Sequence, residues 1–509
     1  MLAQPHPHIH IPATYMTLKT QVAHGLKWQA ISIVGKQFLS LVVFTTLARL
    51  LEPAAFGLIA LVGVYLGIVT MFVDQGISMA LIQRQDLKSE HKDAAFWFNM
   101  GCAVILCLGT MMLAGPVSAL FKEPRLVPLL RWSSLGLVIG ASSAIHATLF
   151  VKAMDFRRPV LRNLTANVAG GAVGVGMALA GCGVWSLVGQ QLASETAGAV
   201  FLWSMSTYRP SMRFSLPRFR ELLGISSSVF TASILWFFSS RLDQIIIGRF
   251  AGMPMLGLYS IAGKMPGLAN MLAQQPVAIV SLPSLSRLQD DHAKMRRAVF
   301  QGMELNAIVS FAIFVGLAAI ASDLVPLLFG AKWAAAAAPC LLLSLFSLVE
   351  ALQVFCYPVL LASGGVGKYV WLNVWHVVGV LVVCLVGIQF GINYLVLGLI
   401  VNSMVIAIPS LLFIRQRIGL SPSSYCKPCL VPALASLLMV GMIWVVAAML
   451  PTDVTLVLRL ACKVAVGGTT YLGCVLLLAP STLKNLANTV GRAFHRSSAL
   501  SDVPVTVQL

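Results

Sequence analysis

The sequence predicts an all-α integral membrane protein of about fourteen transmembrane helices, arranged as two parallel-repeat six-helix lobes around a central cavity plus two C-terminal helices. Three observations lead to this fold class: the composition, the length of the apolar segments, and an internal repeat. Of the 509 residues, 58% are hydrophobic and 10% are charged, whereas soluble domains carry about 25% charged residues. So little charge cannot cover the surface of a soluble protein of this length.

The apolar segments are continuous and about 20 residues long, which is the length that an α-helix needs to cross a bilayer. The strands of a membrane barrel would instead alternate in polarity over about ten residues. We therefore expect helical spans at residues 28–51, 56–73, 96–120, 127–150, 164–180, 184–204, 224–250, 256–283, 298–320, 338–361, 370–390, 394–414, 430–450 and 460–478.

Lys and Arg residues lie mainly between these spans, and about three times as many fall on one side of the membrane as on the other, the asymmetry typical of cytoplasmic segments. We therefore expect both termini in the cytoplasm, and the cations Lys122, Lys332 and Lys463 at the opposite face. This distribution accounts for the net charge of +18, so we expect no binding to nucleic acid. The segments between spans are too short to hold a soluble catalytic or ATP-hydrolysing domain.

The internal repeat relates residues 47–75 to residues 247–275 at a constant offset. The shared residues include an arginine, four glycines or leucines at helical spacing, a methionine and a glutamine: Arg49/Arg249, Gly57/Gly257, Leu58/Leu258, Gly63/Gly263, Gly67/Gly267, Met71/Met271 and Gln75/Gln275. The offset spans six helices, so the two halves run in the same direction and are related by an axis along the membrane normal.

The repeat and the loop lengths predict seven segments. They are a cytoplasmic N-terminal tail (1–27), an N-lobe (28–204), a cytoplasmic linker (205–223), a C-lobe (224–414), a cytoplasmic loop (415–429), two further spans (430–478) and a cytoplasmic C-terminal tail (479–509).

Short motifs narrow the function less than the spans do. Gly63 and Gly67 form a GxxxG pattern that recurs at Gly263 and Gly267; small residues at this spacing either allow close helix packing or form a surface along which helices slide during gating. The GGVGK stretch that ends at Lys368 lacks the spacing of a nucleotide-binding loop. We expect no metal site and no cofactor.

Ionisable residues within apolar spans are the strongest functional signal, because each costs about 2.5–3.5 kcal/mol to insert and usually lines a cavity or has a partner. Three cations lie on the first, seventh and eighth spans: Lys36, Arg241 and Lys264. Three carboxylates are candidates for ion coupling: Asp243, Glu195 and Glu350. The alternatives are that the lysines extend to the membrane interface, and that Arg241 and Asp243 form a structural pair. Residues two apart face away from each other on a helix, so we expect each of these two charges to have a partner on another helix.

Several stretches resemble the polysaccharide-transporter branch of the multidrug/oligosaccharidyl-lipid/polysaccharide (MOP) exporter superfamily, especially Wzx-type flippases of the colanic-acid exporter kind. The resemblance covers residues 18–415 and rests on the order of these stretches: Leu18–Gln37, Leu47–Gly57, Asp74–Asn99, Leu242–Gly248, Leu256–Ala262 and Leu324–Pro339.

This resemblance implies a central cavity lined by the first, second, seventh and eighth helices, and thus by Lys36, Arg241, Asp243 and Lys264. It implies a bacterial inner-membrane transporter, not an enzyme. Its substrate would be an undecaprenyl-pyrophosphate-linked oligosaccharide repeat unit, moved to the periplasmic leaflet for exopolysaccharide, capsule or lipopolysaccharide O-antigen biosynthesis. Transport would proceed by alternating access, coupled to an H⁺ or Na⁺ gradient or to the membrane potential. The polymerase and the chain-length or export proteins of the same pathway are the implied protein partners.

Two other functions remain open at this point. A multidrug exporter of the related MATE type would favour an acidic cavity, which the three intramembrane cations disfavour. A membrane-embedded polysaccharide polymerase or ligase usually has a large periplasmic loop with catalytic residues, and the longest loops here lie on the cytoplasmic side.

Overall fold

The computed structural model describes residues 35–74, 76–212, 215, 237, 240–451 and 454–478. The two expected tails (1–27 and 479–509), the start of the first span, most of the linker and the first half of the seventh span lie outside these residues. Every regular element within the described ranges is helical.

The first half begins with a helix over residues 35–50 and continues with six labelled helices: α2 (Pro53–Asp74), α3 (Ile77–Gln83), α4 (Ser89–Phe121), α5 (Leu126–Lys152), α6 (Arg157–Leu179) and α7 (Trp185–Met205). α3 is a short helix between the second and third spans. The others coincide with predicted spans.

The second half begins with a helix over residues 240–250 and continues with α9 (Gly252–Ala262), α10 (Lys264–Ser286), α11 (His292–Ser310), η1 (Phe311–Val315), α12 (Gly316–Phe329), η2 (Ala331–Ala336), α13 (Ala337–Leu352), α14 (Cys356–Ala362), α15 (Val366–Gly387) and α16 (Ile392–Ile418). The remaining elements are α17 (Pro422–Cys426), η3 (Lys427–Cys429), α18 (Leu430–Met449) and α19 (Leu456–Leu478).

Nine helical stretches within the described residues are long and apolar enough to cross a membrane. The protein is thus a polytopic helical membrane protein, as the sequence predicts. The other expected spans are helical over their described residues but fall outside these length and hydropathy limits, so the count of fourteen stays a prediction.

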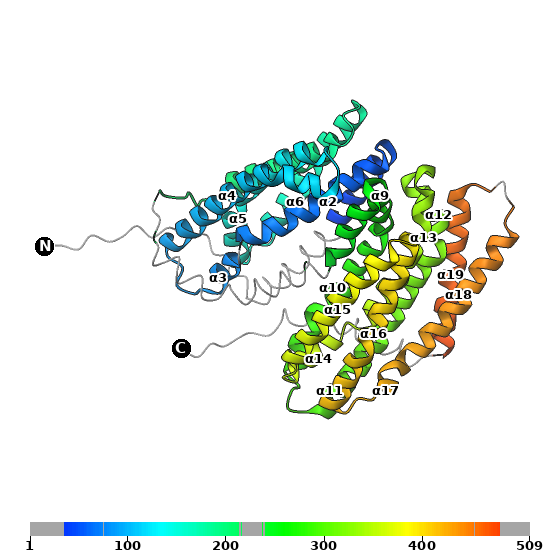
Figure 1. Cartoon of the computed structure of the whole chain (residues 1–509). Helices are drawn as coiled ribbons and strands as arrows, with labels where there is room; N and C mark the ends of the chain where they lie inside the picture. The colour runs from blue at the N-terminus through cyan, green and yellow to red at the C-terminus, as the bar shows by residue number, and fades with distance from the viewer. Residues whose placement is uncertain are drawn as a thin grey trace.

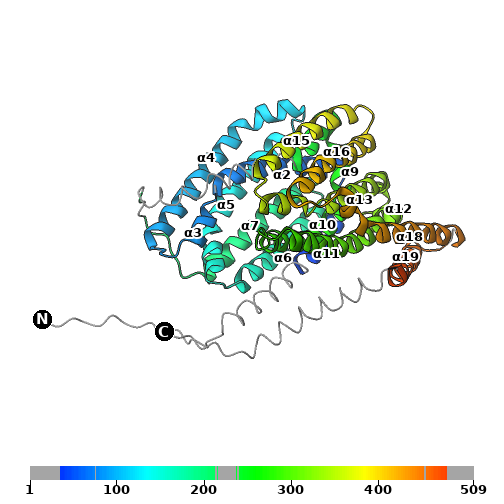
Figure 2. The same cartoon turned by 90° about the horizontal axis from the view of Figure 1, so that it is seen from below.

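The helices form two halves that meet where α2 and α9 lie side by side (Figure 1). From this junction the halves diverge toward the ends that hold α3 in one half and α14 in the other (Figure 1). Figure 2 shows α18 and α19 at the outer edge of the second half, far from α4 and α3. A single buried apolar cluster crosses the junction and includes Leu58 of α2, Leu256 of α9 and Phe329 of α12.

The contact between α2 and α9 is symmetric and joins repeat-related residues. A Cβ atom built on Gly57 would overlap the carbonyl oxygen of Met253, and one built on Gly257 would overlap the carbonyl oxygen of Pro53. Pro53 and Met253 are equivalent positions of the repeat. The two halves therefore pack about an axis that relates them, which is what the parallel repeat predicts.

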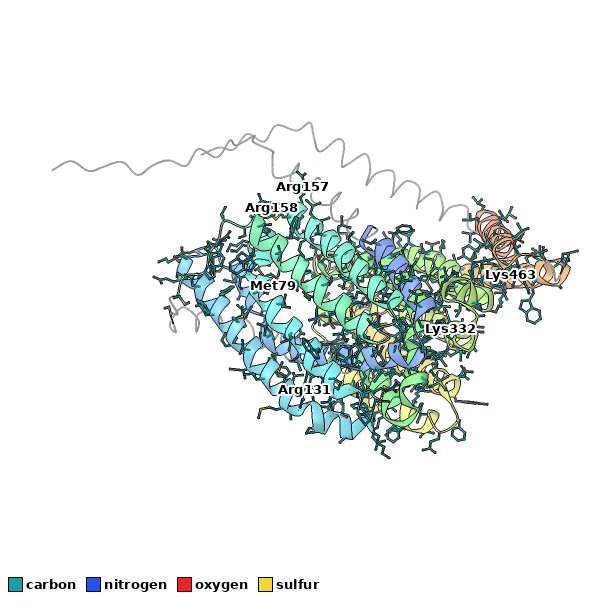
Figure 3. The ribbon with its side chains drawn as sticks, turned by 90° about the horizontal axis from the view of Figure 1, so that it is seen from above. Met79, Arg131, Arg157, Arg158, Lys332 and Lys463 are labelled. Atoms are coloured by element: carbon teal, nitrogen blue, oxygen red, sulfur yellow. The ribbon has the colours of Figure 1, made fainter. Side chains whose placement is uncertain are left out.

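Hydrogen bonds reinforce the same junction across a long sequence separation. The Arg49 guanidinium donates to the carbonyl oxygens of Leu327 and Leu328, at 2.5 and 3.0 Å, at the end of α12. Lys332 in turn donates to the carbonyls of Arg49 and Leu51, at 2.9 and 2.7 Å, and Figure 3 shows it where the two halves meet. Each half thus supplies a cation to the unpaired carbonyls at a helix C-terminus of the other.

We predict that this junction lies on the periplasmic side, since the Lys and Arg distribution places the ends of α4 and α12 there. Reporter fusions after Phe121 and after Gly330 should show periplasmic and no cytoplasmic activity. Cytoplasmic activity at either site would reverse the orientation.

Candidate functional site

Lys264 lies at the contact between the two halves. It is the first residue of α10 and follows Gly263, which separates α10 from α9. Its Nζ atom is 4.4 Å from the ring centroid of Phe44, on the helix over residues 35–50. This is a cation–π contact, and within the described part of the chain Lys264 has no ion-pair partner. A partly buried ammonium group whose described contact is the face of a ring is available to bind an anion.

Phe44 belongs to an aromatic cluster that lies at the junction. Its ring is 5.4 Å from that of Phe56 and 5.8 Å from that of Phe329, both edge-to-face. Phe56 in turn packs at 5.5 Å against Trp333, whose indole N–H donates to the carbonyl oxygen of Ala48 at 2.8 Å. These rings fix the face against which Lys264 rests, because edge-to-face pairs are worth about 0.5–1.5 kcal/mol each beyond their burial.

Arg241 and Asp243 have different surroundings, because residues two apart lie on different faces of a helix. Asp243 accepts hydrogen bonds from the Tyr259 hydroxyl of α9 and from the backbone N–H of Gln244, the latter at 2.8 Å. The Arg241 side chain is exposed, and among the described residues it has no ion pair within 4 Å. The prediction of a partner on another helix is therefore confirmed for Asp243 only.

Lys36 is partly buried on the helix that also carries Phe44. Eight residues of helix separate them, or about 12 Å, so Lys36 lies about two turns away from the Lys264 contact. Its neighbour Gln37 reaches the Met271 sulfur of α10 at 2.6 Å. The structure thus brings Lys36 and Lys264 to the same pair of helices, and no described contact joins either of them to Arg241.

The other two candidate carboxylates are Glu195, which lies within the first half, and Glu350, which lies within the second half. Glu195 of α7 forms an ion pair with Arg162 of α6, with Oε2 and Nη2 3.1 Å apart. Glu350 of α13 accepts a hydrogen bond from the Ser403 hydroxyl of α16, and Gln353 donates to the same hydroxyl at 2.9 Å.

The GxxxG glycines are not the places of closest helix approach. Among the described residues, no heavy atom of a neighbouring helix lies within 4 Å of a Cβ built on Gly63 or Gly267. A Cβ on Gly67 would overlap the Phe237 ring, and one on Gly263 would meet Leu343 at 3.7 Å. The described residues therefore show no close packing at Gly63 or Gly267, and a role of these glycines in packing or in gating stays a prediction.

An apolar groove of about 890 Å³ runs from this site along the outside of the second half. One wall is the helix over residues 35–50 together with α10, represented by Phe38 and Met265. The opposite wall is α18 and α19, and the floor includes Ile313 of the π-helical turn η1. Such turns are rare and often occur at functional sites. Met265 follows Lys264 in the chain, so the helix that begins with this cation forms part of the groove wall.

Sequence reasoning missed a buried ion pair between α12 and α19. The Lys463 ammonium group donates to the Asp323 carboxylate, and the Arg459 Nε lies 3.8 Å from the same carboxylate. Lys463 is 4% exposed and Asp323 6% exposed, so Lys463 is a buried ion-pair partner, and the side of the membrane on which it lies stays a prediction. Figure 3 shows Lys463 on α19 at the edge of the molecule. The available signal was Asp323, an acid within the apolar segment of α12.

We predict that Lys463→Met destabilises the protein by about 3–5 kcal/mol, because it leaves a buried carboxylate without its closest partner. The double variant Asp323→Leu/Lys463→Met should recover most of this loss. Thermal unfolding in detergent measures both. Lys294→Met, which removes a cation from an exposed pair with Asp291, is the matched control and should change little. Equal stability of Lys463→Met and the unaltered protein would contradict the prediction.

Comparison with known sequences relates the chain to polysaccharide export. A family described as "Polysaccharide biosynthesis protein" matches residues 46–338. The succinoglycan biosynthesis transport protein ExoT of Rhizobium meliloti is 27% identical over 313 residues, which cover 62% of this chain and 63% of that protein. The match therefore spans less than two thirds of that relative. The lipopolysaccharide biosynthesis protein WzxC of Escherichia coli is 26% identical over 352 residues, covering 69% of each.

Solved structures with the same fold are transporters. A lipid II flippase, MurJ, in an inward closed conformation superposes with a TM-score of 0.73 at 12% identity, covering 90% of this chain and 100% of that chain. An inward-facing multidrug resistance transporter of the MATE family, a member of the MOP superfamily, superposes with a TM-score of 0.57 at 16% identity, covering 78% and 98%. At these identities the likeness establishes the fold alone.

Proposed function

We propose that this chain, which belongs to the polysaccharide biosynthesis protein family, flips undecaprenyl-pyrophosphate-linked oligosaccharides from the cytoplasmic to the periplasmic leaflet. The lipid-linked oligosaccharide delivered to the periplasmic leaflet would be used in exopolysaccharide, capsule or O-antigen synthesis at a bacterial inner membrane. Relatives named as transport and biosynthesis proteins of such polymers support this proposal. The protein's partners would be the lipid-linked substrate and the polymerase and export proteins that use it.

One observation carries the proposal: the apolar groove is lined by the two helices that bring Lys264 and Phe44 into contact. Met265 lines the groove, and its neighbour Lys264 contacts Phe44 on the helix that forms the same wall. A polyprenyl pyrophosphate needs both features, an apolar surface for its chain and positive charge for its head group. Without such charge, moving the pyrophosphate through the bilayer is prohibitive, because desolvating an ion costs far more than a transport cycle supplies.

The shape of the molecule supports alternating access. The halves are joined at α2 and α9 and diverge at the opposite end (Figure 1); with the predicted orientation, this conformation would receive substrate from the cytoplasm. Lys36, Arg241 and Lys264 would bind the head group in turn. The lobes at 28–204 and 224–414 would move as units, and Gly63, Gly67, Gly263 and Gly267 would ease that movement. Asp243, Glu195 and Glu350 are the candidates for binding the coupling H⁺ or Na⁺.

Purified protein in liposomes tests this function. The probe is a fluorescent undecaprenyl-pyrophosphate disaccharide, and a membrane-impermeant reductant reports how much of it has reached the outer leaflet. We expect protein-dependent flipping that a matched neutral polyprenyl glycoside, which lacks the pyrophosphate, does not undergo. Equal rates for both probes, or no protein-dependent flipping of the pyrophosphate probe, would refute the proposal.

A further inference from the structure

The first half encloses a cavity of about 460 Å³ that the transport path above does not use. It lies among α2, α4, α5, α6 and α7, and its wall includes Arg162 and Glu195. The helix over residues 35–50, which forms the contact with Lys264, contributes none of its lining. The cavity is therefore an internal feature of this half and distinct from the groove and from the junction.

Two buried polar side chains that line this cavity have no hydrogen-bond partner among the described residues. Asn99 is 0% exposed, and neither its amide nitrogen nor its oxygen is paired. Ser133 is 0% exposed and its hydroxyl is also unpaired. Leaving such groups unpaired costs about 1–3 kcal/mol each. The space beside them is large enough for on the order of ten waters, so the chemistry of the wall requires a hydrated interior.

A displaceable ion pair stands in this hydrated space. Arg162 Nη2 is 3.1 Å from Glu195 Oε2, and Nη1 donates to the Asn163 amide oxygen at 3.1 Å. The side chains of Arg162 and Glu195 keep 25% and 37% of their exposure. Arg162 lies against Gly198, one turn along α7 from Glu195, where a Cβ would overlap the guanidinium group. The glycine thus lets the cation lie beside the carboxylate.

Among the residues that the structure describes, no other charged side chain lines the cavity. α2, α4 and α5 contribute the neutral groups Thr70, Asn99, Ser133 and Ser143. On α5, His146 packs instead against Trp203 and Tyr208, and on α4, Asp93 accepts from Tyr208 and Ser211. The Asp74 side chain of α2 lies outside the described part of the structure. One acid and one base therefore face each other in the described wall.

This pairing favours a proton over a metal cation. A sodium ion at Glu195 would sit next to the Arg162 charge and would have a single carboxylate to offset the repulsion. A proton needs no coordination shell. It bonds to the Glu195 carboxylate, gives a neutral carboxylic acid, and frees Arg162 to be solvated by the cavity water.

We propose that this cavity is the proton-coupling site of the transporter, with Glu195 as the group that takes up the proton and Arg162 as the partner that displaces it. The intact pair in a conformation open toward the cytoplasm is the state after proton release. Protonation from the periplasm breaks the link between α6 and α7, and deprotonation restores it. This inference rests on the proposed function and assigns its driving ion.

Steady-state flipping in liposomes measures the coupling directly. With the membrane potential clamped to zero, one proton exchanged per lipid makes a pH difference of one unit change the ratio of probe between leaflets by about tenfold. The probe is the fluorescent undecaprenyl-pyrophosphate disaccharide. We expect this tenfold ratio in the unaltered protein and a ratio independent of pH difference in Glu195→Gln. Asp155→Asn, which breaks the exposed pair of Asp155 with Arg158 in the same half, is the control and should keep the tenfold ratio.

Two further variants distinguish a loss of proton coupling from misfolding or a general loss of activity. Arg162→Gln/Glu195→Gln removes both charges, so it leaves no unpaired ion, and it should also lose the response. Gly198→Ala keeps both charges but moves the guanidinium group off α7. It should change the pH profile of flipping, because the link between α6 and α7 no longer forms in the same geometry.

The results separate this inference from the proposed function. A ratio that follows a sodium gradient and ignores pH would overturn the proton site while leaving the flippase intact. A tenfold pH response in Glu195→Gln or in the double variant, or an unchanged pH profile in Gly198→Ala, would also overturn it. Absence of any flipping by the unaltered protein would instead remove the proposed function itself.

Discussion

Alanine at Gly57 or at Gly257 is expected to reduce polymer export by about ten- to a hundredfold, the largest loss from any single methyl group in this protein. In each case the new Cβ would overlap a backbone carbonyl of the facing helix, that of Met253 or of Pro53. Backbone cannot swing aside as a side chain does, so the junction would have to open. Overpacking of this kind costs about 1–3 kcal/mol. This cost would destabilise the conformation described here, in which the two halves are joined at α2 and α9.

The chain supplies its own matched controls for this prediction. Gly101 of α4 and Gly441 of α18 are helical glycines, one in each half, and no described neighbour lies within 4 Å of a Cβ built on either. Gly101→Ala and Gly441→Ala should therefore export at nearly the normal level. The measurement is complementation of a flippase-null strain, with membrane abundance checked by immunoblot. If all four alanine variants export equally at equal abundance, export does not depend on the close contact between α2 and α9.

Loss of the Lys264 charge is the second large effect that we expect. A hydrogen bond to a charged group contributes about 1.5–3 kcal/mol, so Lys264→Met should lower export by about ten- to a hundredfold. Methionine keeps the length of the side chain and its contact with the Phe44 ring. Lys264→Ala and Arg241→Ala should be similarly impaired, Lys36→Ala less so. Lys264→Arg should retain part of the activity, because both cations attract a mobile phosphate although their geometry differs.

The same complementation assay separates charge from folding. Lys294→Ala removes an exposed lysine whose partner is Asp291 and should export normally. A Lys264 variant that reaches the membrane at normal abundance but fails to export places the charge in the substrate path. Normal export by Arg241→Ala/Lys264→Ala at normal abundance would exclude both residues from that path.

The fold was predictable because the bilayer imposes a length on every element that crosses it. The apolar segments therefore predicted the helices of both halves, and the described residues of each expected span are helical. The repeat was predictable because residues 47–75 and 247–275 occupy equivalent positions in two halves whose helices run in the same direction. Arg49, Gly57 and their counterparts marked these places through their identity alone.

The pairing of charges was much harder to predict. Lys463 and Asp323 are 140 residues apart, and hydropathy carries no information about which helices become neighbours. The GxxxG pattern was misleading for the same reason. Gly63 and Gly57 look alike in the sequence, and only the crossing point of α2 and α9 makes the second one a close contact.

The sequence by itself determined that this is a helical membrane protein built from two similar halves, with few charges inside its spans, because the bilayer penalises each polar group locally and position by position. The tertiary structure alone decided which of those charges are neutralised. Asp243, Glu195 and Lys463 have partners on other helices, whereas Lys264 rests on an aromatic ring. That distinction depends on helix packing over long sequence separations, where shape and not hydrophobicity selects the neighbour.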